Sequence, residues 1–169
     1  MTPAAKHRIG VISDTHIPSR APVVPQAALD IFERRAVDLI IHAGDLSSMA
    51  VVAQLSAYAP VEAVQGNIEQ QDTIAALPLK RELVVGGCAI GIVHVLGERA
   101  RYRATARREF PSARVVIFGH SHIPHLDDTQ GLLLLNPGSA TDRRSQPRCS
   151  VALLTITDGM PRAEIIALP

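Results

Sequence analysis

Short apolar runs alternate with helix-like segments in the first half of the chain. Five runs rich in valine and isoleucine have the length of buried strands, at residues 8–13, 39–42, 61–65, 89–94 and 115–118. Between the first three lie segments with apolar residues on one helical face, at 25–35 and 48–58, where Pro25 and Ser47 or Ser48 suit a helix start. This alternation of strands and helices predicts a parallel sheet flanked by helices.

After residue 78 the pattern changes to one that is typical of β-hairpins. Residues 82–85 and 89–93 flank the turn sequence Gly86-Gly87-Cys88, and further hairpin-like runs occupy 132–135, 151–157 and 163–167. These runs predict a second, partly antiparallel sheet. The sequence has no linker rich in glycine and serine and no internal repeat, so we expect a single domain, residues 1–169, of two packed layers.

Composition narrows the class of protein. Charged residues make up 20% of the 169 residues and apolar ones 47%, as in globular enzymes and binding modules, and the net charge of +1 provides no general attraction to nucleic acid. Cys88 and Cys149 are too few for a disulfide framework, so we expect reduced thiols and a cytoplasmic protein. No apolar stretch reaches the roughly 18 residues that a membrane span requires, and we expect no membrane partner.

Polar side chains follow each of the early apolar runs. Each has an ordinary explanation by itself: Asp14 can cap a turn, Asp45 can begin a helix, and Asn67 can occupy a left-handed turn. Because the carboxyl ends of parallel strands meet at one sheet edge, we expect the whole set to converge there. The set consists of Asp14, His16, Asp45, Asn67, His94, His120 and His122.

This combination of ligand types indicates transition metals. Imidazole and carboxylate together suit Mn, Fe, Zn or Ni better than Ca or Mg, and a bridging carboxylate with flanking histidines suits a pair of ions. His120 and His122 are one residue apart, so on an extended strand both would point to the same face. They could then bind one ion or two adjacent ions.

The ordered motifs resemble the calcineurin-like metallophosphoesterases. The resemblance spans about residues 8–155 and rests on Asp14-Thr15-His16, Gly44-Asp45, Gly66-Asn67, His94, Gly119-His120-Ser121-His122 and Asn136-Pro137-Gly138-Ser139. The small size and the residues after Ser139 are similar to a short bacterial and archaeal phosphodiesterase branch, which the Vps29 subunit of retromer also resembles. The fold that this resemblance implies is α/β, a four-layer α-β-β-α sandwich with two mixed β-sheets flanked by helices.

The resemblance also implies a dinuclear centre and an activity. Asp14, His16 and His122 would bind the first ion and Asn67, His94 and His120 the second, with Asp45 bridging both. The implied cofactors are two divalent transition-metal ions, Mn first and Fe, Zn or Ni as alternatives. The implied reaction is hydrolysis of a phosphodiester, in a small molecule or nucleotide, by a hydroxide that bridges the two ions.

Two residues depart from the family pattern. Ile68 stands where many relatives have a histidine that can protonate the leaving group, and Val95 stands where the family usually has glycine. These departures leave open an alternative function, a catalytically weak scaffold or protein-binding module that retains the metal site, similar to Vps29. Smaller roles are open for His42 and His125 as neighbours of the site, and for Ser139, which lies either in a simple loop or beneath the metal loops.

Five arginines gather in ten residues, the one electrostatic anomaly of the chain. They are Arg99, Arg101, Arg103, Arg107 and Arg108. The segment could be the solvated face of a helix, or it could attract an anionic substrate or partner.

Overall fold

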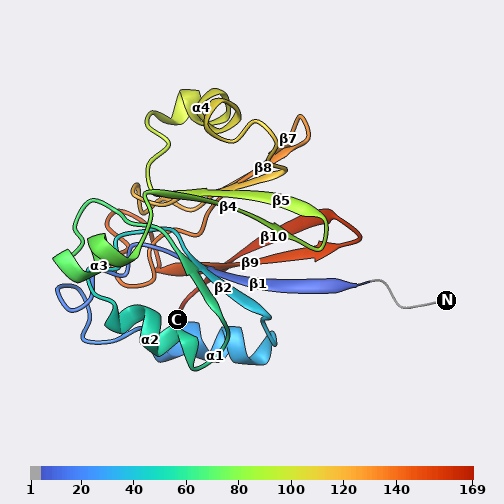
Figure 1. The fold of residues 1–169 in the computed structure, drawn as a ribbon. Coiled ribbons are helices and arrows are strands. Elements are labelled where there is room, and N and C mark those ends of the chain that lie inside the picture. Colours follow the sequence, from blue (N-terminus) through green and yellow to red (C-terminus); the bar gives the residue numbers. More distant parts are fainter. Residues whose placement is uncertain (1–4) are drawn as a thin grey trace.

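The structure, a computed structural model, describes residues 5–169, and the first four residues of the expected domain lie outside the described part. Two five-stranded sheets lie face to face (Figure 1). The first has the order β10-β9-β1-β2-β3, with bounds Met160–Ala167, Ser150–Thr157, Lys6–Ile12, Leu39–His42 and Val61–Ala63. The second has the order β4-β5-β6-β8-β7, with bounds Lys80–Val85, Cys88–Val93, Val115–Ile117, Leu132–Asn136 and His125–Thr129.

The first sheet begins as the sequence predicts. Strands β1, β2 and β3 are parallel neighbours, and the connections between them contain α1 (Gln26–Arg34) and α2 (Ala50–Ser56). Phe32 of α1 and Leu55 of α2 pack with Ile12 and Ile40 in one buried cluster, so both helices cover the outer face of this sheet. The hydroxyl of Ser48 accepts the N–H of Ala50 at 3.2 Å, and α2 begins two residues later than expected.

The second sheet supplies the remaining two layers. The predicted hairpin of β4 and β5 is present and antiparallel, whereas β5, β6 and β8 run parallel. A 3-10 turn (Arg99–Arg101) leads into α4 (Tyr102–Glu109), whose Ala106 packs with Phe110 and Phe118 over the outer face. Alternate residues of the strands, such as Val11 and Ile92, fill the core between the sheets. The four-layer sandwich of two mixed sheets flanked by helices is therefore confirmed (Figure 1).

Strand order differs from the sequence expectation in one respect. The hairpin of β9 and β10 belongs to the first sheet, where β9 pairs antiparallel with β1, and not to the second sheet. Because β9 lies between β1 and β10, its backbone N–H and C=O groups form hydrogen bonds on both edges. Most side chains of β9 are buried. Two elements lacked an apolar signal and were missed, namely β7 and the short helix α3 (Gln71–Ala76), in which Thr73 is the one buried residue.

Three arginines of the cluster have structural partners. The guanidinium of Arg103 donates to the carbonyl oxygens of Thr129 and Leu132 at 2.7 and 2.9 Å, and Arg107 donates to the carbonyl of Gln130. Arg108 pairs with Glu109 at 3.1 Å. Arg103 and Arg107 therefore attach α4 to the β7–β8 hairpin. The interpretation as a solvated helix face is wrong for Arg103, which is largely buried, whereas Arg107 and Arg108 are exposed. In the same described range, no helix has the length and apolar character needed to cross a membrane.

A close approach between β1 and α1 leads to the first testable prediction. A Cβ atom at Gly10 would lie 2.7 Å from Cδ1 of Phe32, so the variant Gly10→Ala should lose about 1 to 3 kcal/mol of unfolding free energy in urea titrations. The smaller side chain in Phe32→Leu should reduce that loss when the two changes are combined. Equal losses from Gly10→Ala in both backgrounds would contradict this packing contact.

Candidate metal centre

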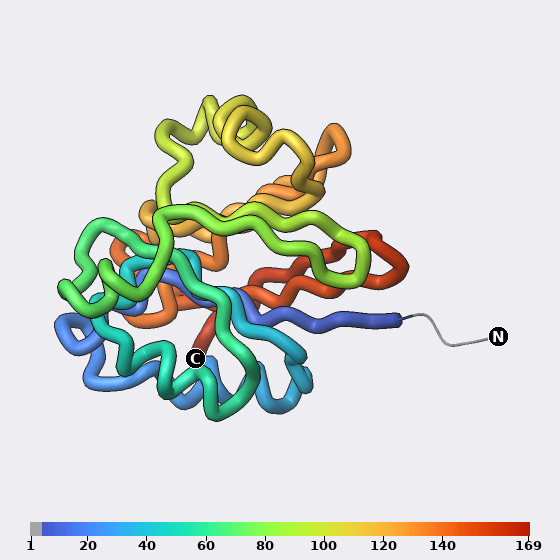
Figure 2. The backbone as a smooth tube through the Cα atoms, in the orientation of Figure 1, coloured from blue at the N-terminus to red at the C-terminus, as the bar shows by residue number. Residues whose placement is uncertain are grey.

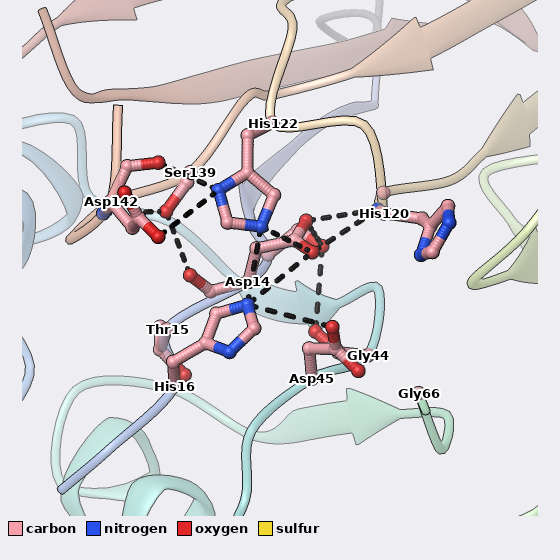
Figure 3. A network of polar contacts seen from close by, with 12 residues as sticks. Asp14, Thr15, His16, Gly44, Asp45, Gly66, His120, His122, Ser139 and Asp142 are labelled. Carbon is pink, nitrogen blue, oxygen red and sulfur yellow. Dashed lines mark hydrogen bonds and ion pairs between the residues drawn. The ribbon is translucent and has the colours of Figure 1, made fainter. Parts of the chain in front are cut away.

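The predicted ligands lie in loops that follow strands of both sheets. Figure 3 shows five of them, Asp14, His16, Asp45, His120 and His122, close together. Asp14 and His16 follow β1, Asp45 follows β2, and Asn67 follows β3, all from the first sheet. The second sheet contributes the residues after β5 and β6, which are His94, His120 and His122. The carboxyl ends of five strands thus meet, as expected for a ligand site in an α/β protein.

The loops have an unusual backbone conformation. Five of the seven predicted ligands have positive φ angles, which non-glycine residues rarely adopt: Asp14 (53°), His16 (45°), Asp45 (56°), His120 (69°) and His122 (60°). Hydrogen bonds between loops hold this conformation, including 3.0 Å bonds from the Asp14 N–H to the Gly44 carbonyl and from the His16 N–H to the Asp45 carbonyl. Clustered backbone strain of this kind is typical of functional sites.

His120 and His122 do not have the extended-strand geometry that the sequence predicted. Strand β6 ends at Ile117, so the two histidines lie in a loop and the alternation of an extended strand does not apply to them. His122 is buried and His120 is exposed. Their side chains join two different groups of polar residues.

Two groups of possible metal ligands result. Asp14, His16 and His122 form the first, and Asp45, His94 and His120 form the second, with the ligand atoms of each group within 4.8 Å of one another. In the first group, Nε2 of His122 lies 3.2 Å from Nε2 of His16 and 3.4 Å from Oδ1 of Asp14. In the second, Nε2 of His94 lies 3.2 Å from Oδ2 of Asp45.

Asp45 lies between the two groups. Its Oδ2 is 3.5 Å from Nε2 of His16, close to the distance that separates it from His94. Burial alone would raise the pKa of Asp45, but His94, the N–H of Asn67 and His16 together lower it to about 2. Asn67 contacts this carboxylate through its backbone, whose N–H donates to Oδ1 at 2.6 Å, and it lines the same cavity as His94.

Backbone carbonyls determine which nitrogen of two buried histidines faces the site. Nδ1 of His94 lies 2.7 Å from the carbonyl oxygen of Ala43, and Nδ1 of His122 lies 2.7 Å from that of Asp142. A carbonyl oxygen can only accept, so each Nδ1 carries the hydrogen, and in the neutral ring Nε2 presents a lone pair to the site. Metal-binding histidines are oriented in this way.

The electrostatics at these nitrogens favour a cation. Nε2 of His94 is buried and makes no hydrogen bond with any residue from 5 to 169, although Asp45 is adjacent. Burial lowers the pKa of His94, but the Asp45 and Asp14 carboxylates outweigh burial and raise it overall. Imidazole lone pairs and carboxylate oxygens that face one another are all acceptors, and a positive charge between them stabilises the arrangement. The donor set therefore fits divalent transition metals.

Glu69, which the sequence pattern did not indicate, and Ser139 hold the loops in place. The carboxylate of Glu69 accepts the N–H groups of Leu46, Ser47 and Gly66 at 3.1, 2.7 and 2.7 Å, which joins the loops after β2 and β3. The one available signal was an acidic residue two positions after the Gly66-Asn67 pair. The hydroxyl of Ser139 donates to the Asp14 carbonyl at 2.7 Å, so Ser139 lies beneath the metal loops, as one of the two interpretations proposed.

Two motif glycines are required by close packing. A Cβ atom at Gly66 would overlap the carboxylate of Asp45, and one at Gly119 would overlap Ser13 Oγ and lie 2.7 Å from Oδ2 of Asp14. Any larger residue at either position would displace an aspartate of the site. The Gly-Asn and Gly-His-Ser-His motifs thus have a steric basis.

The other histidines lie outside the two groups. His42 is fully buried, and its Nδ1 accepts the Gly44 N–H at 3.2 Å, so its Nε2 carries the hydrogen that bonds to Thr15 Oγ1 at 3.0 Å. Burial lowers the pKa of His42 to about 3, which suits a neutral positioning residue and not a proton donor. His125 packs against the rings of Tyr102 and Phe118 instead.

The fold and the site define a metallophosphoesterase, and comparison with known proteins agrees. The chain belongs to the calcineurin-like phosphoesterase superfamily, whose domain profile matches residues 8–159. It is 41% identical over 163 residues to a probable metallophosphoesterase of Methanothermobacter thermautotrophicus, covering 94% of this chain and 91% of the relative. It is 39% identical over 158 residues to one from Methanocaldococcus jannaschii, covering 89% and 76%.

A solved structure of a homologue supports the same fold. Vps29 of Entamoeba histolytica, crystallised in complex with Zn²⁺, superposes with a TM-score of 0.73 at 26% identity and covers 95% of this chain and 98% of its own. The family resemblance inferred from the motifs is therefore confirmed.

The buried His42 gives a prediction on pH dependence. Its pKa is about 6.5 when unfolded and about 3 when folded, so the unfolded state binds the extra proton in that window and stability decreases as pH falls through it. Between pH 7 and 5 this group should remove about 2 kcal/mol from the unfolding free energy of the metal-free protein. In His42→Gln the decrease with pH should be smaller by that amount. An identical pH dependence in both proteins would show that His42 titrates normally.

Proposed function

We propose that the protein is a dinuclear metal-dependent phosphodiesterase, acting on a phosphoester small molecule or nucleotide in the cytoplasm. The main support is the pair of buried histidines whose Nδ1–H groups are held by backbone carbonyls while Nε2 faces the carboxylates of Asp14 and Asp45. Cys88 and Cys149 are both free thiols, in agreement with a reducing compartment.

The proposed ligand assignment follows the two side-chain groups. Asp14, His16 and His122 would hold one ion, and His94, His120 and Asn67 the other. Asp45, within 3.5 Å of imidazole nitrogens from both groups, would bridge them. Manganese is our first choice and iron, zinc or nickel are alternatives, since imidazole with carboxylate suits all four, and the Entamoeba Vps29 was crystallised with zinc.

The chemistry divides between the ions and the protein. Two such ions, when bound, polarise a phosphoryl group and lower the pKa of water so that hydroxide is available near neutral pH. The chain itself orients its ligands: Ala43 and Asp142 fix the buried rings, and the Asn67 N–H orients the Asp45 carboxylate. His120, the exposed member, borders the open side where a phosphate would approach.

Ile68 limits the substrates of such a site. Its side chain is 43% exposed beside Asn67 and cannot donate a proton. Leaving groups that depart without protonation should therefore be tolerated, and unactivated alkyl monoesters should react slowly. Diesters carry one negative charge fewer than monoesters and are repelled less by the carboxylates. The alternative, a catalytically weak scaffold, predicts little or no hydrolysis even of activated diesters.

Metal stoichiometry tests the proposed ligand set. The protein loaded with Mn²⁺ should retain about two ions per chain by elemental analysis and hydrolyse bis-p-nitrophenyl phosphate. Asp45→Ala should lose most bound metal, and its turnover should decrease at least about 100-fold, beyond what loss of an outer partner causes.

The matched control is Asp128→Ala, which removes an exposed aspartate of β7 and should retain both ions and full turnover. Absence of bound metal after loading, together with unchanged hydrolysis in a chelator, would exclude the proposal.

Restoring a proton donor tests the interpretation of Ile68. Ile68→His should increase turnover of alkyl phosphate monoesters more than that of bis-p-nitrophenyl phosphate, because a positioned donor contributes about 100-fold to 10,000-fold only when the leaving oxygen is strongly basic. Ile68→Leu, which keeps an apolar side chain, should leave the ratio of the two rates unchanged. A wild-type protein that prefers alkyl monoesters would show that another group donates the proton.

A further inference from the structure

Two neighbouring cavities lie between the metal centre and α4. A cavity of about 150 Å³ is lined by Asn67 and His94, and a second of about 440 Å³ is lined by Arg101 and Thr105. Val93 and Val95 line both cavities, so the two are neighbours that share these side chains, and we call the pair the Val95 groove. The chain that forms its wall rises from the end of β5 to the layer of α4 (Figure 2).

The first part of the Val95 groove is apolar. Val95 is 39% exposed and Leu79 is 70% exposed, although both stand beside a polar site. Half-exposed apolar side chains that line a concave surface next to convergent polar groups are typical of a ligand site. They favour an aromatic or aliphatic part of a ligand at this position.

The far part of the groove contains an arginine without a partner. Arg101 makes no ion pair and no side-chain hydrogen bond within residues 5–169, in contrast to Arg103 and Arg108. Of the two acidic residues that line the same cavity, Glu109 is neutralised by Lys80 at 3.5 Å and by Arg108, and Glu98 is exposed to solvent. The Arg101 guanidinium is thus available to pair with an anion from the ligand.

We propose that the Val95 groove binds one ester arm of the phosphodiester substrate, and that this arm carries a second phosphate. This inference rests on the proposed function, which places the first phosphate at the metal centre. A flat or apolar portion of the arm packs on Val93 and Val95, and the second phosphate pairs with Arg101, because guanidinium matches phosphate geometry in a bidentate manner. A nucleoside with phosphates at its 3′ and 5′ positions has this chemistry.

Kinetics with three chromogenic diesters test the groove. The substrates are methyl p-nitrophenyl phosphate, the p-nitrophenyl ester of thymidine 5′-phosphate, and the same ester with an added 3′-phosphate. In the Mn²⁺-loaded wild type, KM should decrease along this series. Arg101→Gln should raise the ratio of KM for the third substrate to KM for the second by about fivefold to tenfold, as expected for loss of one charge-assisted contact.

Charge variants separate local contact from general attraction. Arg101→Lys should recover part of the KM ratio and Arg101→Glu should raise it further. Arg34→Gln removes an equal charge from the exposed end of α1, on the opposite outer layer, and should leave the ratio unchanged. An equal effect of Arg34→Gln and Arg101→Gln would overturn the local contact in favour of long-range attraction.

A binding measurement keeps the groove testable even if the proposed activity fails. Thymidine 3′,5′-bisphosphate is titrated into protein that contains Zn²⁺ in place of Mn²⁺. Binding should shift the methyl NMR signals of Val93 and Val95. The variant Arg101→Gln should weaken this binding about fivefold to tenfold. If the methyl diester is hydrolysed but Arg101→Gln changes neither the KM ratio nor the binding of the bisphosphate, the proposed groove is overturned and the phosphodiesterase is not. No turnover of any diester, with methyl shifts that depend on Arg101, overturns the activity and retains the groove as a binding site.

Discussion

The hydrogen bond from Nδ1 of His94 to the carbonyl of Ala43 connects the two sheets at the point where the site forms. His94 follows β5 of the second sheet, and Ala43 follows β2 of the first. The bond from the His120 N–H to the Asp14 carboxylate crosses between the same two sheets. Elsewhere the sheets meet through side chains such as Val11, Ile41 and Ile92. The sandwich is therefore apolar along most of its interface and polar at one end.

Without a positive charge, the buried carboxylates and lone pairs at this polar end raise the free energy of the folded state. Asp14 is completely buried and Asp45 nearly so, and both lie among imidazole nitrogens whose lone pairs face inward. Five residues there also have positive φ angles, each of which costs of order 1 to 3 kcal/mol. The rest of the fold must hold this arrangement, and the bonds from Glu69 and Ser139 to the loop backbones do so. This end is therefore less stable than an apolar one would be, and its arrangement of acceptors fits a cation.

The departures from the family pattern share a physical consequence. Ile68 follows Asn67 and Val95 follows His94, and the two apolar side chains are 43% and 39% exposed. Ile68 stands in place of a possible proton donor and Val95 in place of a glycine, so each adds an apolar surface at the rim of the site. A rim of this kind offers little acid catalysis, but it favours ester substituents with apolar area. Ile68 thus supports the preference for diesters, and Val95 supports the proposed groove for one ester arm.

The local pattern of apolar residues was sufficient to predict the strands β1, β2, β3, β5 and β6, because their apolar runs are short and rich in β-branched residues. The convergence of Asp14, Asp45 and His94 also followed, since the ends of parallel strands share an edge. Tertiary structure alone decided that β9 pairs with β1, because strand partners far apart in the chain leave no local signal. It also decided which nitrogens of His94 and His122 face inward, since this depends on carbonyls that only the fold brings near them. For the same reason it decided that Arg103 pairs with Asp127, whereas Arg101 has no side-chain partner among residues 5–169.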